Sequence, residues 1–443
     1  MIQKLLSVFQ KNPPALPRDV GNNDVAKELR QRKWSVFLAA TFGYGFYYVC
    51  RLTMSVVKKP IVDSGLLDVS EIGIVGSALF FAYAAGKLVN GVLADRLNVR
   101  VFMATGLFVS ACANVLLGFS ATFWAFVVLW GVSGWFQSFG AACSVVSIST
   151  WYDDKQRGSF YGMWSSSHNI GEAITFIGTA IIVTSFGWRW GFWAAGLSCI
   201  VASFLIWRFL CEHPSVYGLP DGASEASSAL TKKSLTAKQF AVFKNPVIWT
   251  LAGASAFFYV TRYAITSWGI FFLEAEKGYS TLEASAILSV GSITGIVSTF
   301  FAGLFSDQFF GGRRNAPALM FGILYVLATA LFVFGPADSV IDSISMLLFG
   351  FALGALIVYV GGLMAVDLCS KDVSGTALGI IGVASYLGAG IQDIISGYLI
   401  EGGKTTTAGV ANYDFEMAGW LWVGSSVISL LLAASVWNAK SID

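Results

Sequence analysis

Charged side chains are scarce in this sequence of 443 residues. Only 12% of the residues are Asp, Glu, Lys or Arg, about half the share of roughly 25% found in average soluble proteins. Apolar residues make up 56%, and the mean hydropathy is +0.68. This composition excludes a soluble enzyme. The apolar residues form long continuous runs, which also excludes an outer-membrane barrel, whose strands alternate apolar and polar residues in short segments.

The residue patterns that bind metals or nucleotides are also missing. The six cysteines are scattered and form no Cys-x-x-Cys pair, and only two histidines are present, so we expect no metal and no other cofactor. Gly311-Gly312 is not followed by Gly-Lys-Ser/Thr, which argues against an ATPase. No nucleophile–base pair can be assembled from the spacings, so we expect a protein that is not an enzyme.

Long apolar runs are what the chain does have. They fall at 34–57, 71–94, 101–120, 123–148, 158–184, 189–210, 247–273, 282–306, 316–336, 341–367, 375–400 and 417–438. Each is close to the roughly 20 residues that a helix needs to cross a bilayer. The runs therefore predict an all-α membrane protein with twelve transmembrane helices.

The runs divide into two sets of six, separated by a polar stretch. The predicted parts are a tail (1–33), a first six-helix bundle (34–210), a linker (211–246), a second six-helix bundle (247–438) and a C-terminus (439–443). Tail, even-numbered loops and C-terminus hold 20 of the 28 Lys and Arg residues. Because cytoplasmic loops carry the excess of cations, both termini are predicted to be cytoplasmic.

Three motifs recur in the two sets at nearly one offset. Gly91-Val-Leu-Ala-Asp95-Arg96 with Arg100 returns after 212 residues as Gly303-Leu-Phe-Ser-Asp307 with Arg313 and Arg314; Tyr48-x-x-Arg51 returns after 211 as Tyr259-x-x-Arg262; Gly158, Gly162 and Gly171 return after 217 as Gly375, Gly379 and Gly388. The repeats predict two homologous bundles related by an axis along the membrane normal. We expect the Asp and Arg residues of the first motif to form conformational latches at the cytoplasmic helix ends.

Three cations lie in the middle part of an apolar run, namely Arg51, Lys87 and Arg262. Each costs roughly 2.5–3.5 kcal/mol near the bilayer centre, so they must face a wet cavity or an acidic partner. Two acids are available, Glu172 and Asp393. Even if both are ionised, three cations and two acids leave a net charge of +1, so we expect a positively charged cavity.

The repeat places Arg51 and Arg262 at matching positions of the two bundles, facing each other across the central axis. A phosphate group carries about −1.5 to −2 at neutral pH, and two planar guanidinium groups can bind its oxygens bidentately. We therefore expect these arginines to clamp a phosphate. Pairing of each arginine with an acid is the structural alternative.

Residues three or four apart share one face of a helix, and several polar rows follow this spacing. The rows are Tyr44, Tyr47 or Tyr48, and Arg51; Tyr83 and Lys87; and Trp164, His168 and Glu172. We expect these side chains to line the cavity. His168 is the one histidine inside a span, where it could donate to phosphate and gain a proton as the anion arrives; the alternative is a buried structural histidine.

The Gly-x-Leu-Ala-Asp-Arg loop resembles the major facilitator superfamily, and further strings narrow the resemblance. They are Gly43-Tyr-Gly-Phe-Tyr-Tyr48-Val-Cys-Arg51, Gly134-Trp-Phe-Gln137, Trp164-Ser-Ser-Ser-His168-Asn169-Ile-Gly171, Pro214-Ser-Val-Tyr-Gly-Leu-Pro220 and Tyr259-Val-Thr-Arg262-Tyr-Ala-Ile-Thr-Ser-Trp268. As a set they resemble the organophosphate:phosphate antiporter family, which includes glycerol-3-phosphate and hexose-phosphate transporters and a hexose-phosphate sensor. The resemblance implies that the two arginines and His168 bind substrate, and that Gln137, Asn169 and Tyr386 face the cavity.

The sequence also departs from that family. Its members commonly have a lysine after the first arginine and an acid before the tryptophan of span 7, where this chain has Leu52 and Ser267. Glu172 stands where the glycerol-3-phosphate transporter has glycine, and Asp393 follows Tyr386 by seven residues. These acids could contact sugar hydroxyls, balance Lys87 or titrate during transport.

We therefore expect a monomeric transporter in the bacterial inner membrane, surrounded by lipid and binding no nucleic acid. It is expected to import a phosphate ester in exchange for inorganic phosphate by alternating access. The polar cavity residues favour a hexose 6-phosphate such as glucose 6-phosphate. Glycerol 3-phosphate and phosphoglycerate remain open, as do a hexose-phosphate sensor without appreciable flux and a proton-coupled symporter.

Overall fold

The computed structural model describes residues 7–18, 23–220, 232–311, 313–368, 373–407 and 410–437, which are mostly helical. The first half contains α2 (Asn23–Asp63), α3 (Val69–Arg96), α4 (Val99–Phe119), α5 (Phe123–Trp151), α6 (Asp154–Ser165), α7 (Ser167–Phe186) and α8 (Trp188–Phe209). The second half contains α10 (Pro246–Ala275), α11 (Thr281–Phe310), α12 (Asn315–Phe334), α13 (Ser339–Val358), the π-helical turn η2 (Tyr359–Leu363), α14 (Met364–Leu368), α15 (Ser374–Gly402) and α16 (Glu416–Ser435).

Short elements fall between and beyond these spans. They are the 3₁₀ turn η1 (Pro214–Tyr217), the helix α9 (Lys232–Lys244) and an antiparallel hairpin of β1 (Thr405–Thr407) and β2 (Val410–Asn412), in which Thr406 pairs with Ala411. Helix α2 begins within the predicted tail, and η1 and α9 lie within the predicted linker. Part of that linker (221–231) and the predicted C-terminus (439–443) lie outside the described residues, so the domain limits stay a prediction.

Ten segments of the described chain are long and apolar enough to cross a membrane, counting α6 with α7 and α13 with α14 as single spans. Helices α2 and α10 complete the predicted set of twelve. They are the first helices of the two bundles, and they carry Arg51 and Arg262 together with several tyrosines. Their polarity is what a helix facing a wet interior requires, because a span that touched lipid on every side would be apolar all round.

The repeat seen in the sequence continues into the helix caps. Helix α3 starts with a capping box, in which Asp68 accepts from the amide of Glu71 while the Glu71 side chain accepts from the amide of Asp68. Helix α11 starts with the same reciprocal bonds between Ser280 and Glu283, 212 residues later. Equivalent helices of the two halves therefore begin at equivalent positions, with their first free amides satisfied in the same way.

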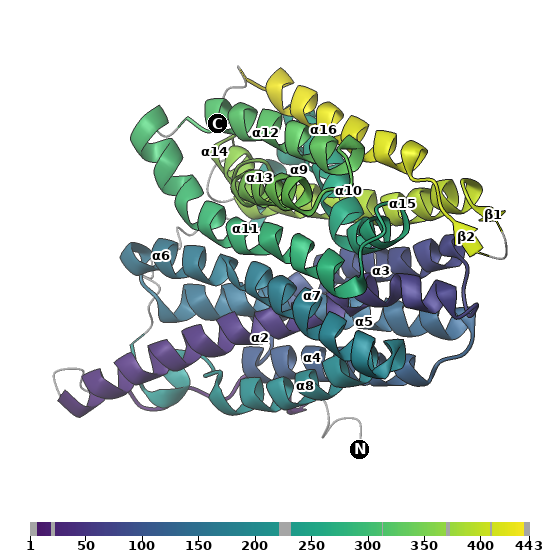
Figure 1. Ribbon diagram of the computed structural model, residues 1–443. Helices are drawn as coiled ribbons and strands as arrows, with labels where there is room; N and C mark the ends of the chain where they lie inside the picture. Colours follow the sequence, from purple (N-terminus) through teal and green to yellow (C-terminus); the bar gives the residue numbers. More distant parts are fainter. Residues whose placement is uncertain are drawn as a thin grey trace.

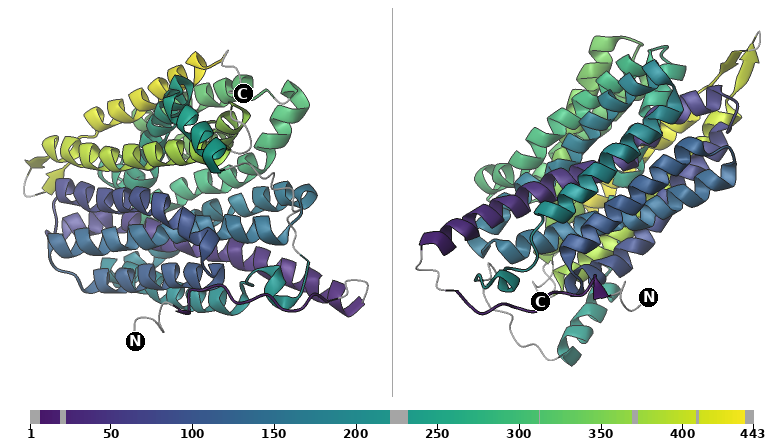
Figure 2. Two further views of the ribbon diagram at one scale, coloured as in Figure 1. Left: turned by 180° about the vertical axis from the view of Figure 1, so that it is seen from behind. Right: turned by 90° about the horizontal axis from the view of Figure 1, so that it is seen from below.

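The two halves form two helical bundles that lie side by side, with α2–α8 in one and α10–α16 in the other (Figure 1). Across the interface, α3 packs on α15, α7 on α11 and α2 on α10. The predicted all-α fold of two pseudo-symmetric bundles is confirmed. Figure 2 shows β1–β2 at one end of the long helices and α9 at the other; we call these the hairpin end and the α9 end.

The bundles touch closely at the hairpin end. A Cβ atom added to Gly73 of α3 would lie 2.5 Å from the carbonyl oxygen of Asp393 and 3.1 Å from the Cα atom of Gly397, both on α15. The amide of Val69 donates to the carboxylate of Glu401 at 3.1 Å, which joins the same two helices. Contact between helix backbones leaves no room for a passage between α3 and α15 at this end.

At the α9 end, by contrast, several glycines of the facing helices have open space beside them. Added Cβ atoms would meet nothing within 4 Å at Gly91, Gly158, Gly162, Gly303, Gly375 and Gly379. These residues lie on α3, α6, α11 and α15, the helices that face the opposite bundle. The structure is therefore closed at the hairpin end and looser at the α9 end.

Candidate anion-binding site

Arg51 is buried on α2 at the bundle interface, with 3% of its surface exposed. Its Nε donates to Gln137 Oε1 at 2.8 Å, and its Nη1 donates to the Tyr386 hydroxyl at 3.4 Å. The guanidinium carbon lies 4.8 Å from the ring centre of Tyr48 and 4.4 Å from that of Tyr83. The second terminal nitrogen, Nη2, is buried and has no hydrogen-bond partner.

Arg262 occupies the matching place on α10 and is also 3% exposed. Its guanidinium carbon lies 5.3 Å from the ring centre of Tyr259 and 5.2 Å from that of Tyr263, and its Nε is buried without a partner. Each arginine thus packs on the tyrosine three residues before it. The repeated Tyr-x-x-Arg motif is a cation–π pair built within one helix turn.

Neither arginine is neutralised by a carboxylate. Among the described side chains, no ion pair within 4.0 Å involves Arg51 or Arg262. Glu172 interacts electrostatically with Arg262, but the hydrogen bond that it accepts comes from Ser292 Oγ on α11 at 3.0 Å. Both arginines act electrostatically on Tyr48 and His168, so the two positive charges influence one shared region between the bundles.

Several polar atoms around this region are buried without a hydrogen-bond partner. They are Arg51 Nη2, Trp164 Nε1, Ser167 Oγ, His168 Nε2, Asn169 Nδ2, Arg262 Nε and Tyr263 Oη. All but His168 Nε2 can donate a hydrogen bond. Buried donors normally have hydrogen-bond partners. A ligand with acceptor oxygens and negative charge could supply partners to these donors.

His168 has a defined orientation. Its Nδ1 lies 2.5 Å from the carbonyl oxygen of Ser165, and because a carbonyl only accepts, Nδ1 carries a proton. In the neutral ring Nε2 is then an acceptor. His168 can therefore accept from a ligand hydroxyl as it stands, and it can donate to a phosphate only after taking up a second proton, as the sequence analysis expected for the functional alternative.

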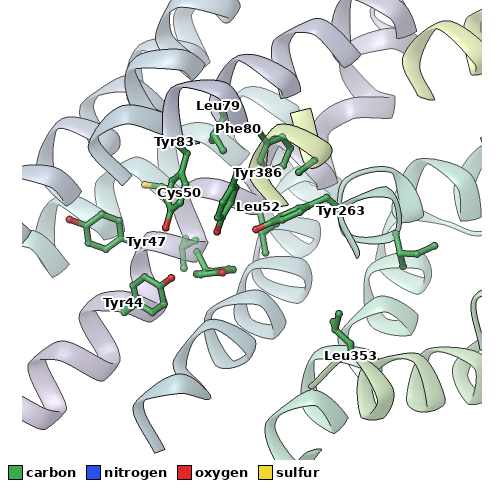
Figure 3. Close-up of a cluster of buried hydrophobic side chains, with 14 of the residues drawn as sticks. Tyr44, Tyr47, Cys50, Leu52, Leu79, Phe80, Tyr83, Tyr263, Leu353 and Tyr386 are labelled. Carbon is green, nitrogen blue, oxygen red and sulfur yellow. The ribbon is translucent and has the colours of Figure 1, made fainter. Parts of the chain in front are cut away.

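Tyr386 of α15 joins the aromatic side chains of the two bundles. Its ring lies between those of Tyr83 and Tyr263 in Figure 3, with ring centres 4.3 Å and 6.0 Å away. The ring centre of Tyr259 lies 5.5 Å from that of Tyr386. Lys87 Nζ lies 5.6 Å from the same ring, and the Lys87 side chain is otherwise exposed. Lys87 therefore stands beside the aromatic cluster rather than within the buried set of donors.

The remaining predicted cavity residues lie on α2, α5, α6 and α7. The ring centres of Tyr44 and Trp164 are 5.1 Å apart, so these two aromatic side chains pack on each other. Gln137 is fully buried between Arg51 and Ser133, to whose Oγ its Nε2 donates at 3.1 Å. Asn169 lies against Gly295 of α11, where an added Cβ would be 3.1 Å from Asn169 Oδ1.

Tyr47 is a correction to the predicted cavity. Its hydroxyl donates to the carbonyl oxygen of Met103 on α4 at 2.6 Å, and its ring lies against Gly140 of α5. It therefore points into the first bundle. Tyr48, one residue or about 100° further round the helix, is the tyrosine that packs on Arg51.

Lys58 and Asp393 are a second correction. The first apolar run was expected to end at residue 57, just before Lys58, but α2 continues to Asp63 and Lys58 is completely buried. Its Nζ donates to Ser267 Oγ at 2.7 Å and lies 3.4 Å from Asp393 Oδ1. Asp393 therefore pairs with Lys58 and not with Lys87. The spacing in the sequence could have placed Lys58 near the site, because Lys58 follows Arg51 by seven residues and so shares its helix face.

The predicted latches differ between the two halves. In the second half Arg314 pairs with Asp307 at 2.7 Å and with Asp367 of α14 at 3.5 Å. Asp95, Arg96, Arg100 and Arg313 form no ion pair with another described side chain. The backbone oxygen of Asp95 instead accepts from Lys11 Nζ at 2.6 Å. Their role as latches stays a prediction.

The sequence is similar to that of known membrane transport proteins and of a membrane sensor. The sequence profile of the Major Facilitator Superfamily matches residues 31–392. A probable hexose phosphate transport protein of Chlamydia muridarum is 30% identical, with 98% of this chain and 97% of that protein covered. The membrane sensor protein UhpC of Salmonella typhimurium is 30% identical (87% and 89% covered), and the glycerol-3-phosphate transporter of Bacillus subtilis is 28% identical (98% and 98%).

Solved structures share the fold at low sequence identity. A bacterial homologue of the human lysosomal transporter Spinster has a TM-score of 0.74 at 17% identity, with 92% of this chain and 96% of that chain covered. The D-xylose-proton symporter has a TM-score of 0.70 at 16% identity, with 92% and 98% covered. These likenesses support the two-bundle architecture.

Proposed function

This chain belongs to the Major Facilitator Superfamily, and we propose that it exchanges an organic phosphate ester for inorganic phosphate across the bacterial inner membrane. The observation that carries this proposal is the pair of buried arginines without carboxylate partners. Two guanidinium groups that contribute from opposite bundles can grip one phosphate dianion only when both bundles approach it. Binding would then favour closure, which is what alternating access around a central site requires.

The proposed ester is a hexose 6-phosphate. Glu172 and Asn169 carry groups that can bind sugar hydroxyls, Gln137 holds Arg51 in place, and the neutral form of His168 offers an acceptor for another hydroxyl. The relatives from Chlamydia that are named hexose phosphate transport proteins support the same choice. The glycerol-3-phosphate transporters and a phosphoglycerate transporter protein of Salmonella typhimurium keep smaller esters as candidates.

In the proposed orientation the α9 end faces the cytoplasm and the hairpin end faces outward, as the distribution of Lys and Arg predicts. The closed contact between α3 and α15 then makes this an inward-facing arrangement. We infer that phosphate and ester enter from the looser α9 end.

Counterflow of labelled phosphate tests the proposal. Proteoliposomes loaded with unlabelled phosphate should take up labelled phosphate, and glucose 6-phosphate outside should compete. Arg51→Lys and Arg262→Lys should each lower exchange about tenfold or more, because lysine keeps the charge but loses the bidentate geometry. Arg208→Lys, at an exposed site on α8, is the matched control. Exchange at full rate in both core variants would refute the clamp.

A sensor and a proton-coupled symporter are the other candidate functions. Each predicts a different result in the transport experiments. Saturable binding of glucose 6-phosphate without counterflow would favour the sensor, for which the relative UhpC is a precedent. Uptake that requires a pH gradient and is lost in Glu172→Gln would favour the symporter.

A further inference from the structure

Lys58 joins the two bundles at the end where they are closed. It lies on α2, two helix turns beyond Arg51 and about 10 Å further along the axis, and each of its contacts is with the second bundle. Its Nζ lies 2.7 Å from Ser267 Oγ of α10, 3.4 Å from Asp393 Oδ1 of α15 and 3.5 Å from the ring centre of Trp268. Ser267 also donates to Asp393 Oδ1 at 2.9 Å.

This cluster communicates with the candidate anion-binding site. A small cavity of about 20 Å³ is lined by residues that include Arg51, Ser55, Tyr263, Ser267 and Asp393. Its size corresponds to about one water molecule. Arg51 therefore borders one shared space with Asp393 and Ser267, two residues whose side chains contact the Lys58 ammonium group.

Opening of the hairpin end must break this pair. Lys58 belongs to the first bundle, whereas Ser267, Trp268 and Asp393 belong to the second, so separation of α2 from α10 and α15 removes these three partners from the ammonium group. An unpaired buried ammonium is unfavourable, but one that faces a water-filled opening is solvated. Lys58 then stands as a free cation between the opening and Arg51, on the same face of α2.

We propose that Lys58 is a phosphate-binding residue of the state open at the hairpin end, and that Asp393 replaces the phosphate as its partner when that end closes. An anion arriving from this side meets Lys58 first and Arg51 about two helix turns later. Closure buries Lys58 against Asp393, which is favourable only after the phosphate has moved on to the arginines. The inference rests on the proposed function, since it assigns a further residue to the same substrate.

Vesicles of both orientations test this role with labelled inorganic phosphate as the probe. In the double variant Lys58→Gln/Asp393→Asn both charges are removed together, which avoids an uncompensated buried charge. The measured quantity is the half-saturating phosphate concentration on the hairpin side divided by that on the α9 side. This ratio should rise about fivefold, which corresponds to roughly 1 kcal/mol for the loss of one charge pair in water.

The neighbouring lysine provides the control. Lys59 pairs with Asp63 on its own helix at 2.6 Å and touches neither Asp393 nor Ser267 in the described structure, so Lys59→Gln should leave the ratio unchanged. A purely structural pair predicts an unchanged ratio in the double variant, and either that result or equal weakening on both sides would overturn the role of Lys58. Failure of the wild-type protein to exchange phosphate would instead overturn the proposed function, and the role of Lys58 with it.

Discussion

At the scale of single residues, the site keeps its arginines charged and oriented without acidic partners. Tyrosine rings provide a polarisable surface for the guanidinium group, and they leave its N–H edges free for a ligand. Arg51 has two rings beside it, and Arg262 has two more. A carboxylate in the same place would occupy those edges and cancel the charge that recognises an anion.

Tyr47 and Tyr48 are adjacent in sequence but should respond differently to mutation. Tyr48→Leu removes a ring from Arg51 and should raise the half-saturating phosphate concentration about threefold or more, since a cation–π contact is worth roughly 0.5–2 kcal/mol. Tyr47→Phe removes one buried hydrogen bond to Met103 and should lower unfolding stability by about 1 kcal/mol, with unchanged phosphate affinity. Thermal unfolding and exchange kinetics measure the two effects, and weaker phosphate binding by Tyr47→Phe would restore that residue to the cavity.

The sequence predicted the arginines because their motif repeats, but it missed Lys58. Lys58 and Lys59 precede Pro60, and the residue before a proline is biased away from helical geometry, so the span was expected to end at Val57. The helix nevertheless continues through Pro60 to Asp63. Only tertiary structure reveals that Asp393, more than 300 residues away, lies beside Lys58.

At the scale of helices, the structure divides the repeated glycines into two kinds of position. Gly171 lies against the backbone of Gly45, where an added Cβ would be 2.2 Å from the carbonyl oxygen, and Gly388 lies similarly against Ala256. Gly162 and Gly379 have open space instead. Sequence alone could not separate the two kinds, because only the tertiary structure shows that Gly171 and Gly388 face a neighbouring helix of their own bundle whereas Gly162 and Gly379 do not.

The open glycines should matter for closure of the α9 end. Gly162→Ala and Gly379→Ala should each stabilise this arrangement by up to about 1 kcal/mol, because alanine favours helix over glycine. Both should slow phosphate exchange about fivefold or more, since an extra methyl group in a close helix contact typically costs 1–3 kcal/mol.

Gly424→Ala is the matched control for these variants. Gly424 lies on α16, which packs on α10, α12 and α15 of its own bundle, and an added Cβ there also meets nothing within 4 Å. It should gain stability without losing exchange. Full exchange rates in Gly162→Ala and Gly379→Ala would show that these helix faces do not come together during transport.

At the scale of the whole molecule, the two bundles enclose more positive than negative charge. Lys58 raises the cations of the middle region to four, with Arg51, Lys87 and Arg262, whereas Glu172 and Asp393 are the acids. With all six ionised, four cations and two carboxylates leave +2, one more than the sequence analysis expected. A phosphate dianion balances this charge, and an empty site does not.

The excess charge predicts that exchange is faster than net flux. Closing the bundles over an empty site must bury unbalanced charges, which costs several kcal/mol per ion, so the empty protein should cross between its two states slowly. Efflux of labelled phosphate from proteoliposomes should therefore accelerate about tenfold or more when unlabelled phosphate is present outside. Lys87→Gln lowers the excess to +1 and should reduce that acceleration. Equal efflux with and without external phosphate, measured with a protonophore present, would mean that the charge of the site does not couple the movement of the bundles to its ligand.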